Sequence, residues 1–472
     1  MRMKALVGSA VMLAALTCGS AGAGVRSPQD ARLAQIASQV EAARIKATVV
    51  KLVGFGTRHT LSSQTDPKRG IGASLRWAEG ELRSFGLTTV TPSEVMSNDR
   101  APAGVKITNV LAIQRGTERP NDVVIISGHI DSRVTDVMNA TADAPGANDD
   151  GSGVAAVIEA ARVLSKRKFR GTIVYAVLMG EEQGLFGGKL LAEYAGSQGW
   201  NVIANLNNDI IGNSCGSDGV CDAKTVRVFS EGPRWQGHEE LAGKIRSLGG
   251  ENDSPSRNLS RFLDRLAERI SAIGLDVRQI WRNDRFGRGG DHTELLNAGF
   301  PAVRLSVAVE NYDQQHQDVR VEKGVNYGDT AEAMDFSYLA KVTRLNTAAL
   351  AAMASAPPPP AGLMAEGAVS TDTRLSWGAV VGARFFTVRK RRTDSASWEA
   401  PRRHDGECIF ISPKHPPGKS SGGACSITLP HVRVDDWVFG VSSVSKDGFE
   451  SPVASAVPGG AFKPYEAPVK SE

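Results

Sequence analysis

The arrangement of apolar residues restricts the fold of this chain more than any other feature. Short, fully apolar runs rich in β-branched residues alternate with stretches in which apolar residues recur every three or four positions. The runs are typical of strands buried on both faces, and the intervening spacing is typical of helices with one buried face. The clearest runs are 122–127, 172–179 and 202–206, with helical stretches at 154–164 and 185–194 between them. This order predicts an α/β fold, a mostly parallel sheet flanked by helices.

Three further segments are expected to surround this sheet. Helical stretches at 31–53 and 73–85 are predicted to pack on it, and 105–113 is predicted to be an edge strand. Residues 214–290 are richer in charge, Gly, Ser and Asn and interrupt the alternation. We expect an insertion there that contains a helix near 259–273.

A run of four prolines, 357–360, divides the chain. Consecutive prolines exclude a continuous helix and favour an extended spacer. The pattern after them changes to short alternating strands separated by Gly and Asp turns, which is typical of a β-sandwich. The sequence therefore predicts an α/β domain over 24–354, a proline linker over 355–360 and a small all-β sandwich over 361–465. An early-strand tryptophan, Trp377, with the later run 437–444 and the turn at 447–451 resembles a fibronectin type III module.

The N-terminus has the features of a secretory signal peptide over 1–23. Arg2 and Lys4 precede an apolar stretch, and small residues end at Ala23, where cleavage is expected. This predicts a secreted or periplasmic protein. No later segment has the length and apolarity of a membrane span.

Four cysteines remain after such cleavage, and they form two local pairs. Cys215 with Cys221 and Cys408 with Cys425 are predicted to form disulfides, which persist in an oxidising compartment.

The net charge indicates which partners to exclude. The formal charge of +4 includes two positive charges of the signal segment, so the mature chain is nearly neutral. A nearly neutral chain has no overall field to attract nucleic acid or an anionic membrane. Partners must therefore be inferred from a local site.

Polar side chains follow the predicted strands or begin a predicted helix at four places. These carry His129 with Asp131, Asp149, Glu181 with Glu182, and Asp209. Because the carboxyl ends of parallel strands meet at one edge of a sheet, the four segments are expected to converge on one crevice. An imidazole and several carboxylates brought together there need a positive counter-charge, which a divalent metal ion supplies.

The number of such side chains fits two metal ions. A two-metal hydrolase needs about three protein ligands per ion, a bridging carboxylate and a base that handles the bridging water. His129 and Asp209 can hold one ion, Glu182 and His316 the other, and Asp149 can bridge them. Imidazole and carboxylate ligands suit zinc, with cobalt or manganese as possible substitutes, so two zinc ions are the predicted cofactors. Neighbouring residues of an extended chain point in opposite directions, which leaves either Glu181 or Glu182 free to accept a proton.

The four segments together resemble a known family. GHIDS at 128–132, PGANDDGSG at 145–153, MGEEQGLFG at 179–187 and NNDIIGN at 207–213 are similar, in this order, to the zinc exopeptidases that include secreted bacterial leucyl aminopeptidases and glutamate carboxypeptidase. The resemblance covers about residues 105–350. It implies that His129, Asp149, Glu182 and Asp209 are metal ligands, that Glu181 is the general base, and that Asp131 orients the histidine.

The last ligand is open between two histidines. The resemblance implies a late histidine closely followed by Asp, which His316-Gln317-Asp318 provides, although the family usually has Tyr or Ile before this histidine and Thr after it. His292, which follows Asp291, matches a family position that shapes the pocket without binding metal. We therefore expect His316 to be the ligand.

The resemblance implies a zinc-dependent aminopeptidase acting on peptides. Three arginines, Arg282, Arg285 and Arg288, precede His292 and could instead bind a substrate carboxylate, as a carboxypeptidase requires. A glutaminyl cyclase with a single working ion and an inert interaction ectodomain are two competing functions that stay open. The C-terminal module could bind or tether an unknown partner, although its sequence indicates no ligand site.

Overall fold

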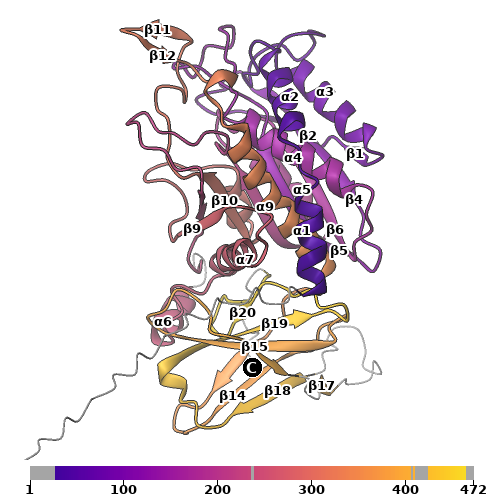
Figure 1. The fold of residues 1–472 in the computed structure, drawn as a ribbon, viewed down its shortest axis with the longest axis vertical. Helices are drawn as coiled ribbons and strands as arrows, with labels where there is room; N and C mark the ends of the chain where they lie inside the picture. The colour runs from indigo at the N-terminus through magenta and orange to yellow at the C-terminus, as the bar shows by residue number, and fades with distance from the viewer. Residues whose placement is uncertain (1–26, 235–238, 405–407, 410–423, 464–472) are drawn as a thin grey trace, which may run out of the picture.

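The structure is a computed structural model that describes residues 27–234, 239–404, 408–409 and 424–463 (Figure 1). The predicted signal peptide lies outside these residues. None of the helices in the described ranges is both long enough and apolar enough to cross a membrane.

An eight-stranded sheet forms the centre of the larger part, in the order β1-β4-β6-β5-β7-β10-β8-β9. Its four middle strands are parallel: β6 (Gly171–Leu178), β5 (Arg119–His129), β7 (Asn201–Asn208) and β10 (Ala302–Val307). The flanking strands are β1 (Thr88–Val90) and β4 (Val110–Gln114) on one side and β8 (Thr225–Phe229) and β9 (Asp276–Ile280) on the other. All of these pairs are antiparallel except β8 with β9. The α/β prediction is confirmed, with a parallel centre inside a mixed sheet.

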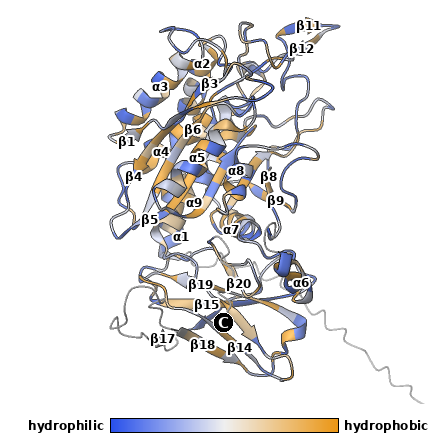
Figure 2. Ribbon diagram, turned by 180° about the vertical axis from the view of Figure 1, so that it is seen from behind, coloured by the Kyte–Doolittle hydropathy of each residue, from blue (hydrophilic) through white to orange (hydrophobic). Residues whose placement is uncertain are grey.

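Helices cover both faces of this sheet because its strands are apolar on both sides (Figure 2). Val124 and Ile126 of β5 face one core, and Val123 and Ile125 face the other, as the two-residue period of a strand requires. The first core is covered by α1 (Pro28–Ala37), α2 (Ala42–Val53), α3 (Ile71–Ser84), α4 (Gly151–Leu164), α7 (Pro255–Arg269) and α9 (Phe336–Ser355). The second is covered by α5 (Phe186–Ser197) and α8 (His292–Asn297).

Two predicted elements are divided in the structure. The stretch 31–53 forms α1 and α2, and the backbone N–H of Glu41 between them donates to Glu159 of α4 at 2.8 Å. The predicted edge strand 105–113 is wrong. It breaks at the fully buried Asn109, whose side chain donates to the carbonyl of Gly187 and accepts from the N–H of Met179. Before this break, β3 (Val105–Thr108) pairs with β2 (Ser93–Met96), whereas β4 lies inside the main sheet between β1 and β6.

The predicted insertion at 214–290 also differs from the structure. Its β8 and β9 extend the main sheet, and α7 packs against it, whereas α6 (Glu239–Ser247) is peripheral. Val226 and Val228 are fully buried with Arg227 between them, so a two-residue strand period is present beneath a polar composition. An interpretation based on the polar composition of the segment misses this strand pattern.

After α9 ends at Ser355, one residue before the prolines, the chain forms two four-stranded sheets. One contains β13 (Met364–Glu366), β14 (Thr373–Gly378), β18 (Ala424–Leu429) and β17 (Cys408–Ile409). The other contains β16 (Arg402–His404), β15 (Phe385–Arg392), β19 (Trp437–Val444) and β20 (Ala454–Ser455). Trp377 and Leu429 from the first pack with Phe386 and Phe439 from the second, which confirms the predicted sandwich. Its resemblance to a fibronectin type III module stays a prediction.

The structure confirms the first of the two predicted cysteine pairs. Cys215 and Cys221 form a disulfide. Cys425 is disulfide-bonded, and it lies opposite Cys408 in the β17–β18 register, although the side chain of Cys408 is outside the described part.

The sandwich lies at the amino ends of the parallel strands. Arg119, the first residue of β5, donates to the carbonyl of Ala356 beside the prolines at 2.6 Å. The 11 residues of β5 span roughly 35 Å, so its carboxyl end at His129 is far from the linker. Figure 1 shows the sandwich beneath α7 and α1, with the hairpin of β11 (Arg320–Glu322) and β12 (Val325–Tyr327) at the opposite end.

Candidate metal centre

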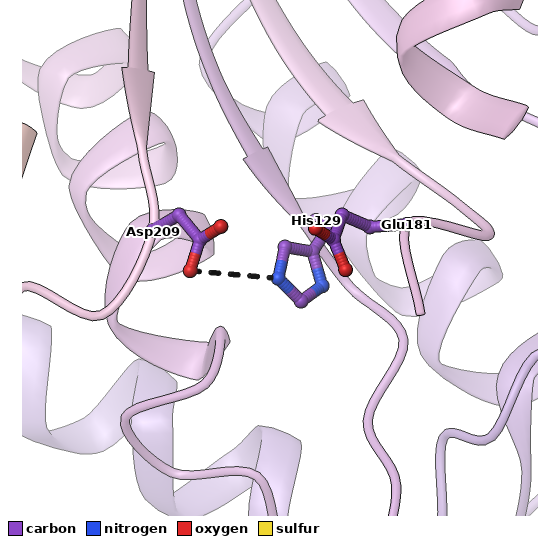
Figure 3. A group of neighbouring side chains, drawn as sticks. All are labelled: His129, Glu181 and Asp209. Carbon is purple, nitrogen blue, oxygen red and sulfur yellow. Dashed lines mark ion pairs between the residues drawn. The ribbon is translucent and has the colours of Figure 1, made fainter. Parts of the chain in front are cut away.

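The predicted site residues meet at the carboxyl edge of the parallel strands. His129 ends β5, Glu181 follows β6, and Asp209 follows β7; one ligand atom from each lies within 4.8 Å of the others (Figure 3). Nε2 of His129 is 3.9 Å from Oδ1 of Asp209. These three side chains, the predicted ligands His129 and Asp209 and the predicted base Glu181, form a first group that could surround a metal ion.

A second group lies beside the first. It contains Asp149, from the loop before α4, with Glu182 and His316. Nε2 of His316 is 2.9 Å from Oδ2 of Asp149 and 3.1 Å from Oε1 of Glu182. His316 has a φ of 58°, in the left-handed region that costs energy for a residue with a side chain. The fold therefore holds this predicted ligand in a conformation that its local sequence does not favour.

Asp149 connects the two groups. Its Oδ1 is 3.2 Å from Nε2 of His129, and its Oδ2 is 2.9 Å from Nε2 of His316. A carboxylate whose two oxygens face two different imidazoles has the geometry of a bridging ligand. The structure thus places Asp149 between the two groups, and its bridging role stays a prediction.

Asp131 positions the adjacent glutamates as well as the histidine. Its fully buried carboxylate accepts from the backbone N–H groups of Gly180, Glu181 and Glu182 at 2.8, 3.3 and 3.1 Å. Its Oδ1 lies 3.6 Å from Nδ1 of His129, whereas its backbone oxygen lies closer to that nitrogen, at 3.1 Å. Asp131 therefore fixes the turn that aims Glu181 and Glu182 in different directions.

The loop that carries Asp149 is held by a second buried carboxylate. Asp329 accepts from the backbone N–H of Asn148 at 2.9 Å and from that of Asp149 at 2.7 Å. Asp150 begins α4 by accepting from the N–H of Gly153, and it also accepts from the N–H of His129 at 3.0 Å. These contacts fix the end of β5 relative to the loop that carries Asp149.

Close backbone packing explains one glycine of the site. A Cβ at Gly128 would lie 2.6 Å from the carbonyl carbon of Gly153, at the start of α4. Only glycine permits this approach of β5 to the helix, and the approach places His129 beside Asp149.

The electrostatics of the site fit a bound cation. Burial raises the pKa of Glu181 well above its usual range, and the nearby carboxylates of Glu182 and Asp209 raise it further, against the effect of His129. Nε2 of His129 and Oε1 of Glu182 are buried and face the groups. Asp149 and His316 lie 3.2 and 3.1 Å from these atoms, but neither contact has the geometry of a hydrogen bond. Buried polar atoms without partners are costly, and coordination of a metal satisfies them. The residues therefore fit zinc in both groups.

Two arginines that the sequence analysis did not name contact the predicted ligands. Nε of Arg133 is 2.8 Å from Oε2 of Glu182, and its Nη2 lies 2.6 Å from Nδ1 of His316. Arg304, fully buried on β10, has its Nη2 2.8 Å from Oδ1 of Asp209 and its Nη1 2.9 Å from Asp284. Their positions depend on tertiary packing, and only the odd placement of Arg304 inside an apolar strand run gives a sequence signal.

His292, the rival to His316 as last ligand, belongs to neither group. It is fully buried at the start of α8, and its Nε2 lies 3.0 Å from the carbonyl oxygen of Asn283. Burial lowers its pKa. The structure thus brings His316, and not His292, to the other predicted ligands.

The parallel strands and the ligand groups at their carboxyl ends define an α/β protein with the zinc exopeptidase-like fold. The chain belongs to peptidase family M28, whose model matches residues 109–336. It is 40% identical to a protein of Leptosphaeria maculans described as a probable zinc metalloprotease, over 92% of this chain and 99% of that protein. It is 41% identical to one of Pyricularia oryzae with the same description, over 91% of this chain and 85% of that protein.

Among solved structures, that of LapA from Legionella pneumophila has a similar fold, with a TM-score of 0.50 and 19% sequence identity. The match covers 69% of this chain and 77% of LapA. The family assignment confirms the resemblance that the four polar segments indicated.

Proposed function

We propose that this chain is a secreted two-zinc aminopeptidase that removes N-terminal residues from peptides. The observation that carries the proposal is the position of Asp149, whose two oxygens face His129 of one ligand group and His316 of the other. The zinc metalloprotease description of the relatives supports the choice of metal. Export rests on the predicted signal peptide at 1–23.

The residues at the site divide the work of peptide hydrolysis. Zinc ions, when bound, supply a water of lowered pKa and positive charge facing the carbonyl oxygen. Glu181 then accepts the proton of the attacking water and returns it to the amine of the leaving peptide. The backbone contacts of Asp131 hold Glu181 in place for both transfers. Glu182 does not take this role because its carboxylate is paired with Arg133 and contacts His316.

Aminopeptidase activity is preferred because the four polar segments resemble those of secreted leucyl aminopeptidases. One observation favours a carboxypeptidase instead. Arg285 and Arg288 line the cavity that contains Glu181 and Asp149, where they could bind the carboxylate at the end of a peptide. Arg282 does not line that cavity and lies 5.3 Å from the ring centroid of Phe286.

A substrate panel tests the proposal. Aminoacyl p-nitroanilides and N-blocked peptides with free carboxyl ends are incubated with the mature protein, with a chelator, and with zinc restored after chelation. We expect cleavage of the free-amine substrates alone, lost on chelation and restored by zinc. Cleavage of only the N-blocked peptides would replace the aminopeptidase proposal with the carboxypeptidase one. Failure of the zinc-loaded protein to cleave either kind would contradict both.

A further inference from the structure

Four arginines line the cavity at the candidate metal centre. It has a volume of about 620 Å³ and is lined by the predicted ligands Asp149, Glu182, Asp209 and His316, by Glu181, and by Arg100, Arg133, Arg285 and Arg288. Two zinc ions would balance the four carboxylates in this lining. The walls around the loaded centre would then be positively charged.

Arg285 and Arg288 belong to the loop between β9 and α8, and they share one counter-charge. Oε2 of Glu310 is 3.4 Å from Nη1 of Arg285 and 3.3 Å from Nη1 of Arg288, while its Oε1 is 2.5 Å from Nη2 of Arg227. Although burial raises the pKa of Glu310, these three guanidinium groups hold it below its usual value. Glu310 is therefore shared by three guanidinium groups, of which Arg285 also contacts Asp284.

The two arginines differ in how firmly they are held. The side chain of Arg285 is 8% exposed, and Asp284 also contacts it, at 3.2 Å. The side chain of Arg288 is 33% exposed, and the hydrogen-bond distances from it to Glu310 and to Gln315 are both 3.3 Å. Arg288 is thus the accessible guanidinium, and Arg285 supports it with a fixed positive charge.

Arg288 lies close to the reacting centre without contacting a predicted ligand. Gln315 accepts from Nη1 of Arg288 and donates from Nε2 to Oδ2 of Asp149, at 3.3 Å in each case. A single amide side chain therefore separates Arg288 from the bridging carboxylate. Arg133, which also lines the cavity, is already paired with Glu182 and His316.

We infer that Arg288, supported by Arg285, forms a subsite for a carboxylate of the substrate, next to the bond that is cleaved. This inference rests on the proposed peptidase function and names the chemical class of its substrates. A guanidinium binds a carboxylate through two parallel hydrogen bonds, which a neutral amide of the same shape cannot match. The carboxylate comes from an acidic side chain if the enzyme is an aminopeptidase, and from the chain end if it is a carboxypeptidase.

Binding of small probes to the zinc-loaded protein tests this inference without turnover. The probes are N-acetylglutamate α-amide, which keeps only the side-chain carboxylate, N-acetylglutamine, which keeps only the α-carboxylate, and N-acetylglutamine α-amide, which has neither. Calorimetry is expected to show that one of the two acids binds about 10- to 100-fold more tightly than the diamide. The acid that is preferred identifies the source of the carboxylate.

Variants distinguish binding of the acid to Arg288 from binding of the acid to zinc. Arg288→Gln is expected to reduce the preference for the acid to about the level that the metal alone gives, and Arg288→Lys to restore only part of it. Arg282→Gln is the matched control, because Arg282 is on the same loop but outside the cavity, and it should keep the full preference. Equal binding of acids and diamide by the unmodified protein would overturn the inference. So would an undiminished preference in Arg288→Gln, or the same loss in Arg282→Gln.

The outcome is distinguishable from failure of the proposed function. The chelation and zinc experiment decides whether the chain cleaves peptides, whereas probe binding decides whether Arg288 recognises a carboxylate. Zinc content measured on each variant confirms that the metal centre is intact.

Discussion

Replacing Glu181 with Gln is expected to lower kcat by about 10²- to 10⁴-fold and to leave the zinc content unchanged. Gln keeps the size of the side chain and its place in the turn fixed by Asp131. It cannot accept the proton of the attacking water, so only the transfer step is lost. The measurement is kcat on the preferred substrate of the panel, with zinc determined by elemental analysis on the same sample.

Glu182 provides the matched comparison for this variant. It is the neighbouring residue, and its Oε1 lies 3.1 Å from Nε2 of His316 in the second ligand group. Glu182→Gln is therefore expected to lose zinc together with activity. If Glu181→Gln lost zinc and Glu182→Gln kept it, the roles of the two glutamates would have to be exchanged.

Replacing Asp253 with Asn is expected to lower the free energy of unfolding by about 3–5 kcal/mol. Asp253 precedes α7 and is fully buried against the sandwich, where it pairs with Arg391 of β15 and accepts from Ser455 of β20 at 3.0 Å. Its other neighbour, Arg261 of α7, lies 3.9 Å away. The Asn variant leaves two buried guanidinium groups without this counter-charge.

Urea unfolding followed by tryptophan fluorescence and circular dichroism measures the effect of Asp253→Asn. Asp394→Asn is the control, because the Asp394 side chain is 82% exposed and its loss should change the free energy of unfolding by less than about 0.5 kcal/mol. A similarly small change in Asp253→Asn would mean that the sandwich is only loosely attached. The expected large change would show that the sandwich is an integral part of the folded protein.

The sequence was sufficient to predict the parallel centre of the sheet and which polar side chains meet at its carboxyl edge. Val123 to Ile126 are apolar without interruption because β5 is buried on both faces, so the strand was recognisable. His129 and Asp209 follow such strands directly. Because strand ends converge, their sequence positions already implied that they meet.

The remaining features depend on contacts between distant segments. The break at Asn109 follows from hydrogen bonds to residues 179 and 187, which local propensity does not contain. The polar composition around Arg227 concealed the strand period of β8. Asp329 and Arg304 reach the site from late parts of the chain, so their roles could not be read from neighbouring residues.

The most direct test of the account is the number of zinc ions held by each chain, measured by elemental analysis after zinc loading and removal of free metal. Two ligand groups joined by Asp149 predict about two zinc ions per chain. A value of one would contradict the bridging role of Asp149 and favour a single-ion enzyme such as a glutaminyl cyclase, and a value of zero would contradict the metal centre itself.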